Sequence, residues 1–106
     1  MERGIIDLVY EGENAIYYHL SNKISKEKIL SKFLCNSEPR EHVEKIFDYE
    51  QHWLAVWSNQ PIERLVKGNT VEFEFSSTKF YENMRHKDIK LENIRNFNVT
   101  YLKKIL

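Results

Sequence analysis

Residues 66–75 read VKGNTVEFEF and carry the clearest structural signal in the chain. The dipeptide Gly68-Asn69 is typical of a turn. After the turn, three apolar residues alternate with two acidic ones: Val71, Phe73 and Phe75 with Glu72 and Glu74. This period of two predicts a strand with one face on the core and one in solvent, as in an antiparallel sheet.

The C-terminal stretch repeats the pattern. Residues 97–106 read FNVTYLKKIL, and Phe97, Val99 and Tyr101 alternate there with polar residues. We therefore expect a second strand whose inward face carries these three side chains.

Two more strands are expected at the N-terminus. IIDLVY (5–10) and AIYYHL (15–20) are β-branched and aromatic runs separated by EGEN, which predicts a hairpin with a positive φ angle at Gly12. Period two gives these inward faces: Ile6, Leu8 and Tyr10 on the first strand, and Ile16, Tyr18 and Leu20 on the second.

Three other segments are candidates for helices. Residues 24–36 predict a helix capped by Ser25, with Ile29, Leu30, Phe33 and Leu34 on one stripe. Residues 40–51 fit a helix or a strand, and the strand is slightly preferred. TKFYENMRH (78–86) predicts a short helix.

The expected fold is a single α+β domain over residues 1–106. It has a small, curved, mostly antiparallel sheet, or a partly closed barrel, with one or two packed helices.

Residues 52–61, HWLAVWSNQP, hold both tryptophans of the chain. On a strand, Trp53, Ala55 and Trp57 share one face, and the opposite face can supply the core through Leu54 and Val56. The Trp face is therefore either core, which is the preferred interpretation, or a platform on which a partner docks.

Composition and motifs exclude several classes of function. Sixteen basic residues balance sixteen acidic ones, so no global field attracts nucleic acid or an anionic membrane. There is no signal peptide and no apolar run of about 18 residues, so a soluble, cytoplasmic protein is expected. Cys35 is the only cysteine and is interpreted as buried and inert. The four histidines lack the spacing of metal ligands, and no metal or other cofactor is expected.

No catalytic motif is present, so a non-enzymatic module that binds another protein or regulates it is the leading hypothesis. A phage or mobile-element inhibitor, or an immunity-type protein, fits the size and composition. The candidate partner-binding residues are Trp53, Trp57, Glu72 and Glu74.

Two alternatives remain open. The first is a nucleic-acid-binding module that stacks bases on aromatic residues and neutralises phosphates with cations. Its candidate residues are Phe80, Tyr81, Arg85, Lys87, Lys90, Arg95, Tyr101, Lys103 and Lys104. The second is a small nuclease using His52, His86, Arg85 and a glutamate.

Overall fold

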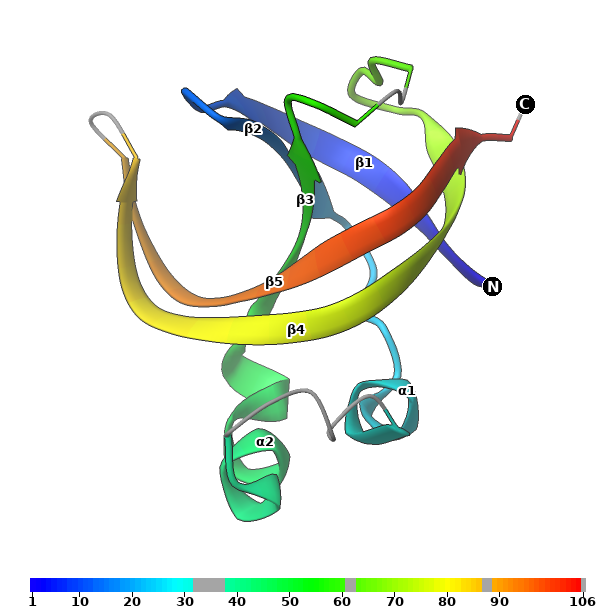
Figure 1. Cartoon of the computed structure of the whole chain (residues 1–106). Helices are drawn as coiled ribbons and strands as arrows, with labels where there is room; N and C mark the ends of the chain where they lie inside the picture. The colour runs from blue at the N-terminus through cyan, green and yellow to red at the C-terminus, as the bar shows by residue number, and fades with distance from the viewer. Residues whose placement is uncertain (32–37, 61–62, 87–88, 106) are drawn as a thin grey trace.

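A long β-hairpin dominates the structure, which is a computed structural model (Figure 1). The structure describes residues 1–31, 38–60, 63–86 and 89–105, and it describes side chains outside residues 83–92. The described elements are β1 (Glu2–Glu11), β2 (Ala15–Leu20), α1 (Lys26–Ser31), α2 (Arg40–Ile46), the 3-10 helix η2 (Phe47–Tyr49), β3 (Gln51–Trp57), β4 (Thr70–His86) and β5 (Ile89–Lys104). The expected turn precedes β4, and Gly68 adopts the left-handed conformation there, with φ 95°.

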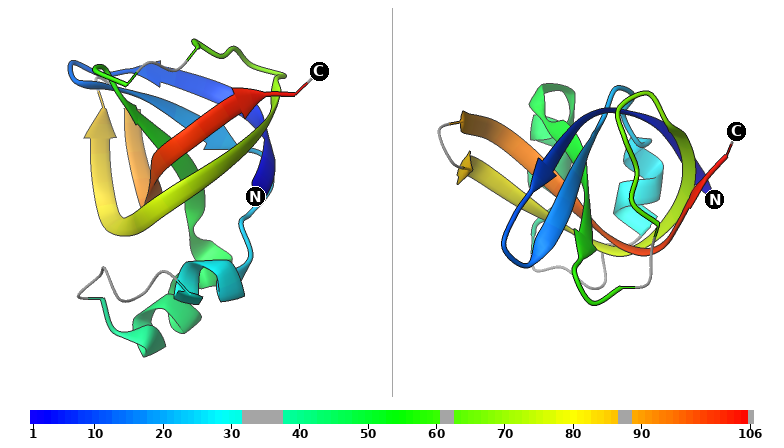
Figure 2. Two further views of the ribbon diagram at one scale, coloured as in Figure 1. Left: turned by 45° about the vertical axis from the view of Figure 1, so that its right-hand side comes forward. Right: turned by 90° about the horizontal axis from the view of Figure 1, so that it is seen from above.

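The strands of the described residues form a ring in the order β1-β2-β3-β5-β4. All neighbours are antiparallel except β3 and β5, which are parallel. β4 returns to β1 only over Thr70–Phe73, whereas β4 and β5 continue together far beyond that point. The far arm of the hairpin therefore projects past the ring (Figures 1 and 2).

The inside of the ring is the hydrophobic core. Its fully buried strand residues include Ile6, Tyr18, Leu54, Phe73 and Phe97. The two short helices lie together at one end of the ring (Figure 2), where Ile29 of α1 and Val43 of α2 join the same cluster. The predicted α+β fold with a curved, mostly antiparallel sheet is confirmed.

The predicted helix after Ser25 is confirmed over its described part. The backbone N–H of Lys28 donates to the Ser25 Oγ at 3.3 Å, which is the expected cap. Ile29 is buried, and Leu30 packs against the core. Phe33 and Leu34 lie outside the described residues, as does Cys35.

Two element predictions are wrong. Residues 40–51 do not form a strand: α2 and η2 occupy them up to Tyr49, because helical spacing brings Val43 and Phe47 to the core. Residues 78–86 do not form a helix but belong to β4. There Thr78 is buried while Lys79 is exposed, and the long β5 strand supplies the hydrogen-bonding partner.

Irregular pairing also overturns some predicted faces. A register shift between Ile6 and Leu8 turns Leu8 and Tyr10 away from the core, so Val9 packs inward instead. On β5, Thr100 has no opposite residue because Glu74 pairs with Tyr101 and Phe75 with Val99. Tyr101 is consequently exposed, and Leu102 joins the core in its place.

Among the described residues, the glycine with a positive φ angle is Gly68, so the expectation for Gly12 is wrong. The first turn closes instead through a hydrogen bond from the Gly12 N–H to the Ala15 carbonyl at 2.8 Å. No described helix has the length and apolar character needed to cross a membrane.

Candidate binding face

The two tryptophans of β3 have different surroundings although they share a face. Trp53 is only 2% exposed, whereas Trp57, at the end of the strand, is 46% exposed. Neither belongs to the core cluster, which takes Leu54 and Val56 from the other side of β3. Trp53 is therefore buried on the outside of the ring, and Trp57 remains open to solvent.

Side chains of the N-terminal hairpin cover Trp53. The Tyr10 ring stacks on the indole with centroids 5.3 Å apart and planes inclined by 12°. His19 meets the same indole edge-on at 4.8 Å, and its Nδ1 is paired with a carboxylate oxygen of Asp7. The register shift in β1 makes this cover, because without it Tyr10 would face the core.

The surface around the tryptophans spans all five strands and is called here the outer aromatic face. It consists of Tyr10 on β1, Tyr17 on β2, Trp53, Ala55 and Trp57 on β3, Asn96 on β5, and Lys79 and Tyr81 on β4. The residues next to them in sequence identify this side: Tyr18, Leu54, Arg95 and Phe97 are buried on the inside of the ring.

The outer aromatic face is strongly curved (Figure 1). Burial of the hydroxyl and, to a lesser degree, the nearby Tyr81 raise the pKa of Tyr17 above its ordinary value. Tyr17 lies on β2 and Tyr81 on β4, which are separated in the strand order by β3 and β5. Lys79 extends over the Tyr81 ring, with the Nζ 5.3 Å from the centroid.

One polar atom on this face has no hydrogen-bonding partner among the described residues. Asn96 is 7% exposed, and its Oδ1 is buried without a hydrogen bond. The cross-strand partners of Asn96 are Trp53 on one side and Lys79 on the other. Asn98, the next outward residue of β5, is different because its Nδ2 donates to the Ser77 Oγ at 2.8 Å.

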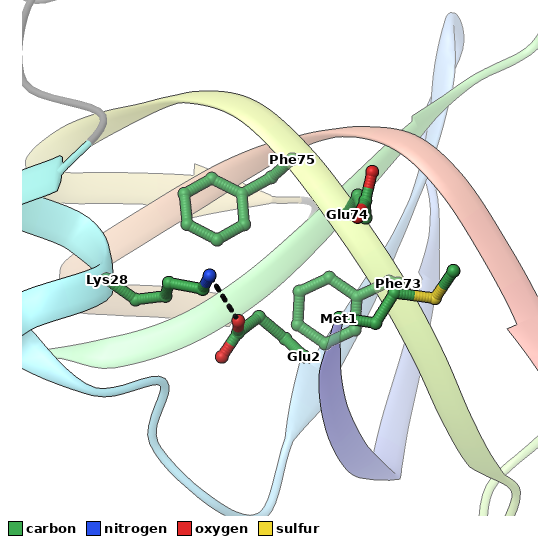
Figure 3. Close-up of a pocket in the computed structure, with 6 residues that line it drawn as sticks. All are labelled: Met1, Glu2, Lys28, Phe73, Glu74 and Phe75. Carbon is green, nitrogen blue, oxygen red and sulfur yellow. Dashed lines mark ion pairs between the residues drawn. The ribbon is translucent and has the colours of Figure 1, made fainter.

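The acidic half of the predicted partner site lies elsewhere. Glu72 and Glu74 belong to the β4 segment near β1, and the ring places other strands between them and the tryptophans of β3. Glu74 borders a pocket formed where β1 and β4 meet α1 (Figure 3). In that pocket the Lys28 Nζ and a Glu2 carboxylate oxygen form an ion pair at 3.6 Å, beside the rings of Phe73 and Phe75.

The predicted nucleic-acid residues are also dispersed. Tyr81 lies on the outer aromatic face. Phe80 points inward, where its ring contacts the His42 imidazole and the Arg95 guanidinium. Tyr101, Lys103 and Lys104 are exposed at the opposite end of β5. Arg85 and Lys90 lie on the far arm of the hairpin, where side chains are not described, and Lys87 lies outside the described residues.

Arg95 is the centre of a buried charge network inside the ring. Its Nη1 and Nη2 donate to the two carboxylate oxygens of Glu38 at 3.0 and 2.9 Å, and its Nε donates to the Glu50 Oε1 at 2.8 Å. Thr78 accepts a further bond from Nη1 at 2.9 Å. Burial lowers the pKa of Arg95, but the two carboxylates outweigh that effect and raise it above its ordinary value.

His52 joins the network through Glu50. The Ile24 N–H donates to its Nδ1 at 2.9 Å, so Nε2 carries the proton and donates to the Glu50 Oε1 at 2.9 Å. Burial lowers the pKa of His52, and the hydrogen bond to Glu50 offsets only part of that effect. His52 is therefore a neutral residue enclosed by Phe47 and Phe97, away from any substrate in solvent.

Sequence reasoning missed Tyr10, Tyr17, Lys79 and Asn96 as members of the face. Tyr17 alternates with the predicted inward residue Tyr18, so its outward direction could have been read from the period. Tyr10 and Asn96 gave no such signal, because their positions depend on a register shift and on pairing between distant strands. Among the described residues, no group of three or more His, Cys, Asp or Glu side chains is arranged to hold a metal ion.

Comparison with known proteins adds no relative: no family model matches the chain, and neither a curated protein nor a solved structure shows significant similarity to it.

Proposed function

We propose that this protein is a binding module that docks another protein on the outer aromatic face. The observation that carries the proposal is Trp57, a large aromatic side chain that is 46% exposed at the end of a central strand. Tryptophan is the residue type most enriched among those that dominate interface energies. The stacked rings of Tyr10 and Trp53 lie on the same side of the sheet, with Trp53 four residues before Trp57 on β3.

The charge of the face supports a protein partner. Its described side chains include one cation, Lys79, which lies over the Tyr81 ring. At its border, Asp7 is paired with His19. Interface centres are depleted in charge, and nucleic-acid sites concentrate it. An aromatic surface whose described side chains carry little charge therefore fits a protein better than a polyanion.

The titratable groups inside the ring fit a structural role. His52 and Arg95 both donate to the Glu50 Oε1, and the three side chains are fully buried, while the Glu50 Oε2 has no hydrogen-bonding partner among the described residues. A general base must come within hydrogen-bonding reach of the proton that it removes. Substrate could approach His52 only if the core opened, so binding accounts for this protein better than catalysis does.

The test is an affinity pull-down from a lysate of the source organism, with the full chain as bait. Trp57→Ala is compared with Tyr49→Ala, because Tyr49 is 76% exposed and lies at the other end of β3. We expect one stoichiometric protein on the wild type and on Tyr49→Ala, and about a tenfold loss or more on Trp57→Ala. Equal retention by both variants would remove the outer aromatic face from the interaction.

A separate measurement tests whether the protein also regulates the partner that it binds. An inhibitor or immunity-type protein lowers the activity of the protein that it binds. The retained partner is therefore assayed with and without the chain. Inhibition that depends on Trp57 supports the regulatory role, and an unchanged activity assigns the module to assembly instead.

A nucleic-acid ligand is the second candidate, and the contact of Lys79 with Tyr81 favours it. A cation beside a stacking aromatic is the usual arrangement for a single strand. In this case affinity for an oligonucleotide falls steeply with salt and weakens on Lys79→Glu, whereas Lys103→Glu, at the opposite end of β5, has a smaller effect. An affinity that does not change with salt excludes the candidate.

A further inference from the structure

Both ring nitrogens of His52 are engaged in hydrogen bonds. Nδ1 accepts the backbone N–H of Ile24 at 2.9 Å, and Nε2, which carries the proton, donates to the Glu50 Oε1 at 2.9 Å. A second proton can therefore bind only at Nδ1. There it would point at the N–H of Ile24, so that two donors would face each other. The charged form of His52 is incompatible with the contact to Ile24.

The contact to Ile24 fastens the connection between β2 and α1, residues 21–25, to the ring. Ile24 is 2% exposed, and its side chain belongs to the core cluster. The next residue, Ser25, caps α1. The preceding residue, Lys23, donates from its Nζ to the Phe47 carbonyl at 2.7 Å. Through His52, the start of α1 is thus tied to a strand far away in the sequence.

Charged groups face His52 from several elements. Glu50, just before β3, favours the charged imidazole through its hydrogen bond and its charge. Arg95 of β5 and Lys23 of the connection oppose it because they are cations. From α1, Lys26 places its ammonium over the phenylalanine ring that packs on His52. Burial of the imidazole is the largest influence, and the pKa of His52 is lowered below its ordinary value.

We propose that His52 is an acid-sensitive latch on the connection between β2 and α1. When a proton from solvent binds at Nδ1, the N–H of Ile24 is displaced, and residues 23–31 move away from the end of the ring while the five strands stay paired. The opened form uncovers the apolar side chains of Ile24 and Ile29. This inference is independent of the proposed function.

Acidification favours the opened form. In that form His52 has its ordinary pKa near 6.5, whereas in the closed form its pKa is lower. Below pH 6.5 the opened form therefore takes up the proton first, and the ratio of opened to closed molecules rises by up to about tenfold per pH unit. Above pH 7.5 neither form binds the proton, and the ratio does not depend on pH.

Native-state hydrogen exchange of the full chain, followed by NMR, measures this opening. Between pH 7.5 and pH 5, the protection factor of the Ile24 amide should fall about tenfold after correction for its intrinsic exchange rate. The Ser21 amide is the reference, because it donates to the Ile5 carbonyl at 2.9 Å and so to β1. At pH 5 it should be at least tenfold better protected than Ile24. Equal protection of the two amides would mean that the whole domain opens together, which overturns the latch.

His52→Asn removes the titration but keeps a side-chain oxygen that can accept the N–H of Ile24. In this variant the protection factor of Ile24 should not change between pH 7.5 and pH 5. His19→Asn is the matched control, because His19 contacts Trp53 on the other face of β3. The tenfold fall should persist in that variant. A fall that persists in His52→Asn as well would overturn the proposal.

The ¹⁵N resonances of the His52 ring test the latch without a substitution. At pH 7.5 they should show the neutral form with the proton on Nε2. On acidification, proton uptake at Nδ1 and the loss of Ile24 protection should follow the same curve. Proton uptake by His52 while the Ile24 amide stays protected would show that the closed form accommodates the charged imidazole, and the latch would be overturned.

Discussion

Trp53 and Trp57 show how far a residue's role depends on its neighbours. Both lie on the same face of β3, as period two predicted, yet Trp53 is covered and Trp57 is open. The cover comes from Tyr10 and His19, which belong to the N-terminal hairpin. The preferred interpretation, that the Trp face is buried, is therefore right for Trp53 and wrong for Trp57.

Fluorescence quenching resolves the two indoles. In Trp53→Phe only Trp57 emits, and we expect red-shifted emission that acrylamide quenches severalfold more strongly than in Trp57→Phe. The reason is the exposed fraction, which is 46% for Trp57 and 2% for Trp53. Far-ultraviolet circular dichroism of both variants serves as the control for folding. Equal quenching of the two variants would contradict the stacked cover of Tyr10.

At the scale of elements, the sequence predicted what short-range periodicity determines. The strands at Val71–Phe75 and Ile16–Leu20 have the predicted inward faces, and Ser25 caps the predicted helix. The faces around Leu8 and Tyr101 were wrong because irregular pairing shifts the alternation by one residue. Such a shift depends on a partner strand far away in the sequence, and no local pattern reports it.

The two misassigned segments have the same physical origin. Residues 78–86 extend as a strand because β5 pairs with them along their whole length. Residues 40–49 are helical because the helix brings Val43 and Phe47 to one end of the ring. In both cases the local sequence favours helix and strand almost equally. Contacts with a distant part of the chain then decide which of the two forms.

Arg95 joins separate elements, and its removal has a definite consequence. It connects β5 to Glu38, which precedes α2, and to Glu50, which precedes β3. Arg95→Met leaves two carboxylates buried without their cation, and we expect a loss of about 3–5 kcal/mol in the free energy of unfolding. Chemical denaturation monitored by circular dichroism measures the loss.

A matched control uses an exposed ion pair of the same kind. Arg40 pairs with Glu44 on the surface of α2 at 3.2 Å. Arg40→Met should change the free energy of unfolding by no more than about 0.5 kcal/mol. Similar losses in the two arginine variants would show that the buried network contributes no more than a surface pair.

For the molecule as a whole, the buried network makes stability depend on pH in one direction. Burial lowers the pKa of His52 below its ordinary 6.5, with Glu50 offsetting part of the effect. Burial would raise the pKa of Glu38, but the hydrogen bonds and charge of Arg95, together with His42, lower it below its ordinary 4.5. Both groups therefore bind protons less readily in the folded chain than in the unfolded chain.

Acidification should consequently destabilise the protein in two stages. Below pH about 6.5 the unfolded chain gains a proton at His52 before the folded chain does, and below about 4.5 the same holds for Glu38. The free energy of unfolding is thus highest near neutral pH, falls first through the range of His52, and falls further through the range of Glu38. Denaturation midpoints measured from pH 7 to pH 3 follow both stages.

His52→Gln isolates the first stage. Glutamine does not titrate, so we expect the variant to be less stable than the wild type at pH 7 but to lose less stability between pH 6.5 and 5. The second stage should persist in the variant because Glu38 and Arg95 remain in contact. An identical slope in the two proteins between pH 6.5 and 5 would assign the first stage to other histidines, and His52 would then titrate as an ordinary exposed imidazole despite its buried position beside Glu50.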